Sequence, residues 1–130
     1  MTDPGRRHPD IHTLPLRLAA VEAIPDGACL GIDAGFGGLA TGVFLYRQDR
    51  RIRCYVNSCP HTGVTLEWLP HRFLDPTGKY IQCTTHGALF RPQDGLCIAG
   101  PCVGQTLRRC SIGVEDGLVW LKAPPPPPFG

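Results

Sequence analysis

Apolar residues occur along the chain in short runs, separated by turns rich in glycine, proline and aspartate. Four pairs of runs flank such turns and predict β-hairpins: 42–46 with 52–56, 73–74 with 80–82, 89–90 with 96–98, and 111–114 with 118–121. Residues 28–33 predict a further short strand, whereas the run from Leu16 to Ile24 fits a strand or a short helix equally well. Short strands at this spacing predict an all-β fold of small antiparallel β-sheets, as a sandwich or incomplete barrel.

Composition supports this fold class and one folded domain. The 16 glycines and 14 prolines make 30 of the 130 residues, which favours turns and short strands over a helical bundle. The polar segment 1–13 is expected to be a flexible N-terminal arm, 14–122 the folded domain, and 123–130 a proline-rich tail in an extended conformation.

Charge and cysteine content limit the compartments and partners. The formal net charge is +2 with both signs interspersed, so we expect no nucleic-acid partner and no membrane surface. Apolar stretches are too short to span a bilayer, and no apolar segment follows Arg6 and Arg7 as in a signal peptide. Seven cysteines is an odd number for a disulfide scaffold, so reduced thiols or metal ligands in the cytoplasm are expected.

Two short motifs carry the candidate chemistry: Cys59-Pro60-His61 and Cys83-Thr84-Thr85-His86-Gly87. Each follows a predicted strand and offers one sulfur and one imidazole, so together they provide two of each. A tetrahedral zinc ion accepts such a set, although zinc motifs usually pair Cys with Cys and His with His. A [2Fe–2S] centre with both cysteines on one iron and both histidines on the other suits the mixed order better. Packing thiols and surface histidines are the alternative without a metal.

The motifs resemble those of the Rieske [2Fe–2S] protein family, ferredoxin type, over about Leu16 to Leu121. The first is similar to the family's C-x-H loop, the second to its C-x-x-H-G loop, and Gly95, Gly100 and Pro101 to its glycine turn and covering proline loop. The resemblance implies three small antiparallel sheets, with a cluster-binding part at about 54–105. It assigns Cys59 and Cys83 to the inner iron and His61 and His86 to the outer iron. It also places these residues around the cofactor: Pro60, Gly63, Val64, Thr85, Gly87, Ala88, Phe90, Gly100 and Pro101.

This chain departs from the family's high-potential members at four positions. Val64 and Thr85 occupy the positions of their inter-loop disulfide, and Ala88 and Phe90 those of their Ser and Tyr hydroxyl donors. Both differences predict a reduction potential in the lower part of the Rieske range, which is roughly −150 to +300 mV. Because the ligand imidazoles titrate, the potential is expected to fall further at alkaline pH. Between His61 and Cys83, residues 62–82 form a segment longer than usual in the family.

The resemblance implies a one-electron carrier that passes electrons from a reductase to an acceptor enzyme such as an oxygenase. We expect no catalytic activity of its own, and weak, transient docking to redox partner proteins around Pro60, Leu89, Pro101 and Val103. A small Rieske subunit of a larger oxidoreductase, of the nitrite reductase type, and a zinc-stabilised interaction module remain alternatives. Cys97 and Cys102 are expected to be buried packing thiols, with a redox-active pair as the alternative. His71 shows no partner pattern in the sequence and is expected to be a surface residue.

Overall fold

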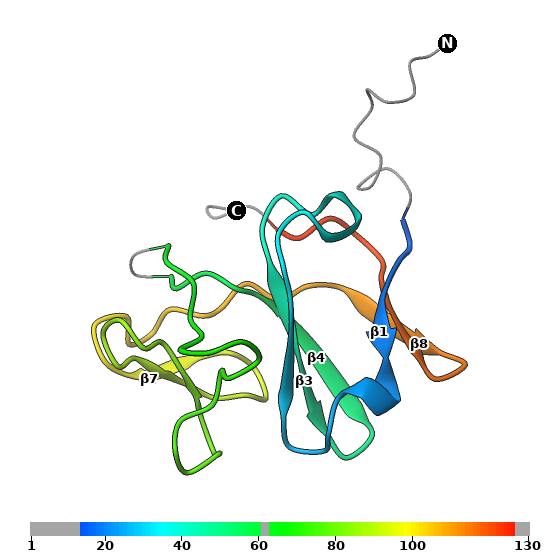
Figure 1. Ribbon diagram of the computed structural model, residues 1–130. Helices are drawn as coiled ribbons and strands as arrows, with labels where there is room; N and C mark the ends of the chain where they lie inside the picture. Colours follow the sequence, from blue (N-terminus) through cyan, green and yellow to red (C-terminus); the bar gives the residue numbers. More distant parts are fainter. Residues whose placement is uncertain (1–13, 61–62, 127–130) are drawn as a thin grey trace.

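The computed structural model describes residues 14–60 and 63–126, which form three antiparallel sheets of three short strands each (Figure 1). The sheets have the strand orders β1-β9-β8, β2-β3-β4 and β5-β6-β7. In chain order the strands are β1 (Leu16–Ala20), β2 (Cys29–Ile32), β3 (Val43–Gln48), β4 (Arg51–Val56), β5 (Ile81–Gln82), β6 (Leu89–Phe90), β7 (Cys97–Ala99), β8 (Ile112–Glu115) and β9 (Leu118–Leu121). Single 3₁₀ turns, η3 (Val21–Ala23) and η4 (Phe36–Gly38), are the helical elements in these residues. The all-β prediction is confirmed.

Three of the four predicted hairpins are present. Strand β3 pairs with β4 from Val43↔Val56 to Gln48↔Arg51, β6 pairs with β7, and β8 with β9. The 73–82 hairpin is reduced to an isolated bridge between Leu74 and Ile81, beside β5. The ambiguous run from Leu16 to Ile24 contains both expected structures, because β1 leads directly into η3.

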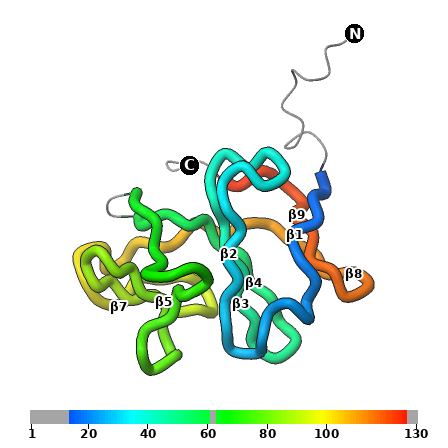
Figure 2. The backbone as a smooth tube through the Cα atoms, viewed as in Figure 1, coloured from blue at the N-terminus to red at the C-terminus, as the bar shows by residue number. Residues whose placement is uncertain are grey.

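The sheet β2-β3-β4, here called the middle sheet, lies between the other two sheets (Figure 2). Its two faces pack into different hydrophobic cores. Because successive strand residues point to opposite faces, Phe44, Tyr46 and Tyr55 face the part that carries the two motifs. Val43, Leu45, Cys54 and Val56 face the opposite core, which includes side chains of β1 and β9. The motif-bearing part therefore rests on a sheet that is packed on both faces.

The long segment between the two motifs is anchored on this middle sheet. The Phe73 ring is fully buried and stacks on Phe44, with ring centroids 4.1 Å apart. His71 is exposed, but its Nδ1 accepts a 2.9 Å hydrogen bond from the backbone N–H of Gly31 in β2. The expected surface position of His71 is confirmed. Its hydrogen bond to Gly31 joins residues forty positions apart, which local sequence does not reveal.

At the C-terminal side, Arg108 Nη1 donates a 2.9 Å hydrogen bond to the carbonyl oxygen of Pro126. The described part of the proline-rich segment is thus attached to the domain. The expected arm at 1–13 and the end of the tail lie outside the described residues. None of the helical elements that the structure describes has the length and apolar character needed to cross a membrane.

Candidate metal centre

The two motif loops have the same backbone turn. In the first, the N–H of Cys59 donates to the carbonyl of Val64 (2.8 Å), and the N–H of Gly63 donates to the carbonyl of Cys59 (2.7 Å). In the second, Cys83 donates to Ala88 (2.9 Å) and Gly87 to Cys83 (2.8 Å). The glycine has a positive φ in both loops, 80° and 72°, which explains why glycine stands four residues after each cysteine. The chain thus presents each cysteine from an equivalent position.

The two cysteine side chains meet below the loop tips. Cys59 is 1% exposed and Cys83 is fully buried, and their thiols are within hydrogen-bonding contact. Burial raises the pKa of Cys83, while the backbone N–H groups of Thr85 and His86 hydrogen-bond its sulfur and oppose that rise. Backbone donors aimed at a sulfur favour the thiolate, which is the form that binds a metal.

Leu66 ties the two loops together through its backbone. Its N–H donates to Asn57 Oδ1 at 2.8 Å, and its carbonyl accepts from the N–H (3.3 Å) and the Oγ1 (3.2 Å) of Thr84. Asn57 Nδ2 also donates to Glu67 Oε1 at 2.8 Å. These hydrogen bonds join the two loops without a covalent cross-link between Val64 and Thr85.

A third loop covers the second one from the side. Gly100 has φ +100°, and a Cβ placed on it would lie 2.8 Å from the Cα of Ala88. Such an approach between two backbones is possible only for glycine here. The loop that follows β7 and contains Gly100, Pro101 and Cys102 is therefore packed directly against the residue that closes the Cys83 turn.

The remaining predicted site residues separate into buried and exposed groups. Two of them, Ala88 and Phe90, are fully buried and carry no hydroxyl. The exposed ones are Val64, Thr85, His86 and Pro101, and Pro60 is half-buried. His61 lies outside the described residues. Across residues 14–60 and 63–126, no three or more His, Cys, Asp or Glu side chains form a group that could hold one metal ion. A binuclear centre of the expected kind places two protein ligands at each iron.

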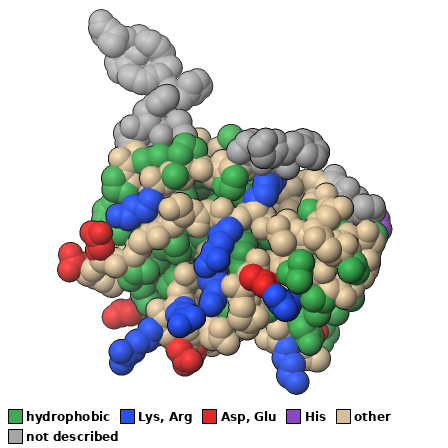
Figure 3. Space-filling model, turned by 180° about the vertical axis from the view of Figure 1, so that it is seen from behind, with side chains coloured by type: hydrophobic (Ala, Val, Ile, Leu, Met, Phe, Trp, Pro, Cys, Tyr) green, Lys and Arg blue, Asp and Glu red, His purple; other side chains and the backbone are tan. Residues whose placement is uncertain are grey.

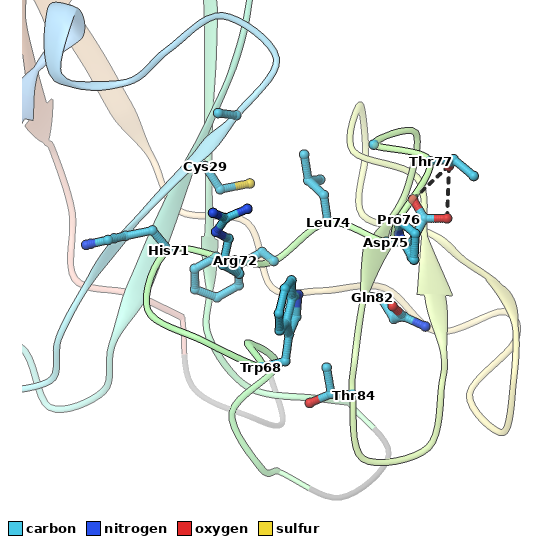
Figure 4. A pocket seen from close by; sticks show the side chains of 13 residues that line it. Cys29, Trp68, His71, Arg72, Leu74, Asp75, Pro76, Thr77, Gln82 and Thr84 are labelled. Carbon is cyan, nitrogen blue, oxygen red and sulfur yellow. Dashed lines mark hydrogen bonds between the residues drawn. The ribbon is translucent and has the colours of Figure 1, made fainter.

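A groove of about 600 Å³ runs along the segment between the motifs (Figure 4). Its wall includes Thr84 of the second loop, Trp68 and Arg72, and the guanidinium carbon of Arg72 lies 5.9 Å from the Trp68 ring centroid. Trp68 is 51% exposed. The segment between the motifs therefore forms the surface beside the second loop.

Two features of the site were missed in the sequence. Arg91 and Gly95 form the same turn as the cysteine loops, since the N–H of Arg91 donates to Leu96 (2.9 Å) and that of Gly95 to Arg91 (2.7 Å). The sequence contained a signal for this third turn, because a glycine stands four residues after Arg91 just as it does after Cys59 and Cys83. The second feature, contact between the Cys102 and Cys59 thiols, joins residues 43 positions apart and leaves no local signal.

Comparison with known proteins identifies the family. The family model of the Rieske [2Fe-2S] domain matches residues 16–119. The chain belongs to the Rieske [2Fe–2S] family. Comparison with curated protein sequences finds no match.

Solved structures share this Rieske fold. The ferredoxin of carbazole 1,9a-dioxygenase from Nocardioides aromaticivorans IC177 has a TM-score of 0.66 at 20% identity, covering 85% of this chain and 99% of that one. The Sphingomonas yanoikuyae B1 ferredoxin has a TM-score of 0.64 at 24% identity, covering 85% and 99%. A chain in a complex of reduced oxygenase and oxidized ferredoxin of carbazole 1,9a-dioxygenase has a TM-score of 0.66 at 22% identity, covering 86% and 95%. At these identities the likeness establishes the fold.

The cofactor of this Rieske domain is a [2Fe–2S] cluster, and the residues present fit it. Two buried sulfurs lie in contact, two backbone N–H groups are directed at one of them, and an exposed histidine follows three residues after that cysteine. This donor set provides thiolates inside and an imidazole at the surface, as a Rieske centre requires.

Proposed function

We propose that this protein is a one-electron carrier that takes an electron from a reductase and passes it to an acceptor enzyme such as a Rieske-type oxygenase. The observation that carries the proposal is the pair of equivalent loops, which bring Cys59 and Cys83 together in the interior. The bound cluster accepts and releases one electron, and the chain supplies its ligands and its insulation from water.

Four residues are the proposed ligands: Cys59 and Cys83 for the inner iron, His61 and His86 for the outer iron. Burial of the two sulfurs supports the inner position, and the exposure of His86 supports the outer one. An imidazole at the surface shortens the path from the metal to a docked partner, so His86 and His61 are the proposed electron exit.

The proposed docking surface surrounds these histidines. It consists of Pro60, Leu89, Pro101 and Val103; Val103 is 62% exposed and Pro101 is exposed as well. Basic and acidic side chains are interspersed on the face seen in Figure 3. A small apolar patch suits a transient redox interface of less than about 1,200 Å². We place the protein in the cytoplasm, because an odd number of seven cysteines favours thiols and metal ligands over a disulfide scaffold.

The first experiment is optical and EPR spectroscopy of anaerobically purified protein before and after dithionite. A brown protein that bleaches and gives a rhombic EPR signal of low average g is expected. A colourless protein that contains zinc, after loss of the cluster has been excluded, contradicts the proposal and favours the zinc-stabilised module.

Ligand assignment is tested by iron and acid-labile sulfide content in single variants. Cys83→Ser and His86→Ala are expected to lose the cluster. His71→Ala is the matched control. His71 is also an exposed loop histidine, but its imidazole is hydrogen-bonded to Gly31 of the middle sheet and is not a proposed ligand. Full cluster content in His86→Ala contradicts its role as a ligand.

Electron transfer is tested by mixing the reduced protein with an oxidised Rieske oxygenase and following reoxidation. Val103→Glu is expected to slow reoxidation, because it places a charge in the apolar docking surface. Its EPR spectrum is expected to match that of the wild type, which shows that the cluster itself is unaltered. Stable co-purification with a large catalytic subunit favours the alternative role as an oxidoreductase subunit.

A further inference from the structure

The buried core of the motif-bearing part contains four cysteines, two more than the proposed ligands require. Cys59, Cys83, Cys97 and Cys102 belong to one buried core cluster, and each is at most 1% exposed. The Sγ of Cys102 donates to the Sγ of Cys97 at 3.1 Å, and burial, with a contribution from the neighbouring Cys59 thiol, raises the pKa of Cys102. Cys102 therefore lies between Cys97, which is not a proposed ligand, and Cys59, which is a proposed iron ligand.

The thiol protons in this group can be assigned. Cys97 Sγ donates to the carbonyl oxygen of Ala99 at 3.2 Å, so its proton is engaged and its sulfur can only accept. Cys102 has one proton and two sulfur acceptors, Cys97 and Cys59. When Cys59 ligates iron it is a thiolate, and an ionised acceptor forms a stronger hydrogen bond than a neutral thiol does.

From this geometry we propose that Cys102 is a positioning residue whose S–H donates to the Cys59 ligand sulfur and raises the reduction potential of the centre. The inference rests on the proposed function. Reduction adds one negative charge to the cluster and its sulfur ligands, so a donor on a ligand sulfur stabilises the reduced state more than the oxidised state. The chain has Ala88 and Phe90 where high-potential relatives are expected to carry hydroxyl donors, and Cys102 supplies a weaker donor from the covering loop.

The covering loop holds this thiol in place. The N–H of Gln105 donates to the carbonyl of Cys102 (2.9 Å), and the N–H of Cys97 donates to the carbonyl of Gln105 (2.8 Å). The contact of Gly100 with Ala88 fixes the other side of the loop against the Cys83 turn. The Cys102 side chain thus points inward although its neighbours Pro101 and Val103 are exposed.

The test is an anaerobic redox titration of the full-length holoprotein, followed by EPR. Cys102→Ala is expected to shift the midpoint to a more negative potential, corresponding to a several-fold lower ratio of reduced to oxidised protein at fixed potential. Cys102→Ser keeps a donor and is expected to restore much of the shift. Cys97→Ala, the matched control, removes a buried thiol of the same cluster that does not donate to Cys59, and is expected to leave the midpoint close to that of the wild type.

A second readout identifies the proton itself. After exchange into D₂O, pulsed EPR of the reduced protein is expected to show a deuteron coupling that is absent in Cys102→Ala and present in Cys97→Ala. This spectrum depends on the thiol and is not reproduced by a general loss of packing.

Several outcomes overturn the inference. They are an unchanged midpoint in Cys102→Ala, an equal shift in Cys97→Ala, or a mass showing that Cys97 and Cys102 are joined as a disulfide in the active protein. Each leaves the proposed carrier function standing, provided the wild type carries the cluster. A wild type without a cluster signal overturns both proposals.

Discussion

The ring of Phe73 stacks on the ring of Phe44 at a centroid distance of 4.1 Å and an interplanar angle of 11°. Phe44 belongs to the middle sheet, and Phe73 belongs to the long segment between the two cysteine loops. Both side chains are fully buried. This pair is therefore a principal attachment of the metal-binding part to the sheet beneath it.

Replacing Phe73 by Ala is expected to destabilise the protein by about 3–5 kcal/mol, because it removes a buried ring and leaves a cavity. Urea unfolding followed by circular dichroism measures the change. Phe36→Ala is the matched control, since Phe36 is 45% exposed and loses little burial. Equal losses in the two variants contradict an anchoring role for Phe73.

Replacing Asn57 by Ala is expected to cost about 1–3 kcal/mol, because the buried N–H of Leu66 loses its acceptor. The first cysteine loop is then less firmly joined to Thr84 of the second, so faster cluster loss in air is also expected. Glu67→Gln serves as the control because it keeps an oxygen acceptor for Asn57 Nδ2. Unfolding experiments and the decay of visible absorbance report the two effects, and a stable Asn57→Ala cluster contradicts the second.

Replacing Gly100 by Ala is expected to lower both thermal stability and cluster content, since its Cβ meets the backbone of Ala88 at 2.8 Å. Gly104→Ala is the comparison. Gly104 has a similar positive φ of 93°, but its added Cβ would meet nothing within 4 Å. The difference between the two variants isolates the clash from backbone strain, and visible absorbance per protein measures cluster content. Similar behaviour of both variants contradicts close packing of the covering loop.

Stability is expected to fall at alkaline pH. Burial is the main cause that raises the pKa of Cys29 from 9.0 to about 12 and that of Tyr55 from 10.0 to about 12. The folded protein thus keeps protons that the unfolded chain releases, so this contribution is complete below about pH 9 and is lost as pH rises toward 12. Thermal unfolding at a series of pH values from 8 to 11 measures it.

Tyr55→Phe separates the two groups in that experiment. It removes the Tyr55 titration together with the 2.7 Å hydrogen bond to the carbonyl of Pro92. Lower stability at every pH is expected, with a shallower decline above pH 10. A decline as steep as that of the wild type assigns the alkaline loss to other groups.

Local patterns were sufficient for most of the strands. The turns at 48–51, 91–95 and 115–117 separate apolar runs, and these runs form β3 with β4, β6 with β7, and β8 with β9. The 73–82 hairpin was less well predicted, because its strands are held by contacts to the middle sheet through Phe73 and form only a bridge of their own. The same limitation explains the missed hydrogen bond of His71 to Gly31.

Short motifs in the sequence were enough to identify the candidate ligands and the resemblance to the Rieske family, because cysteine and histidine at fixed short spacings define a donor set within each loop. How the loops are joined and shielded from water is visible only in the folded chain. The bridging backbone of Leu66, the approach of Gly100 to Ala88 and the placement of Cys102 beside Cys59 all connect residues distant along the chain. Such contacts depend on how three separate sheets pack, which short-range hydrophobic patterns and turn residues do not encode.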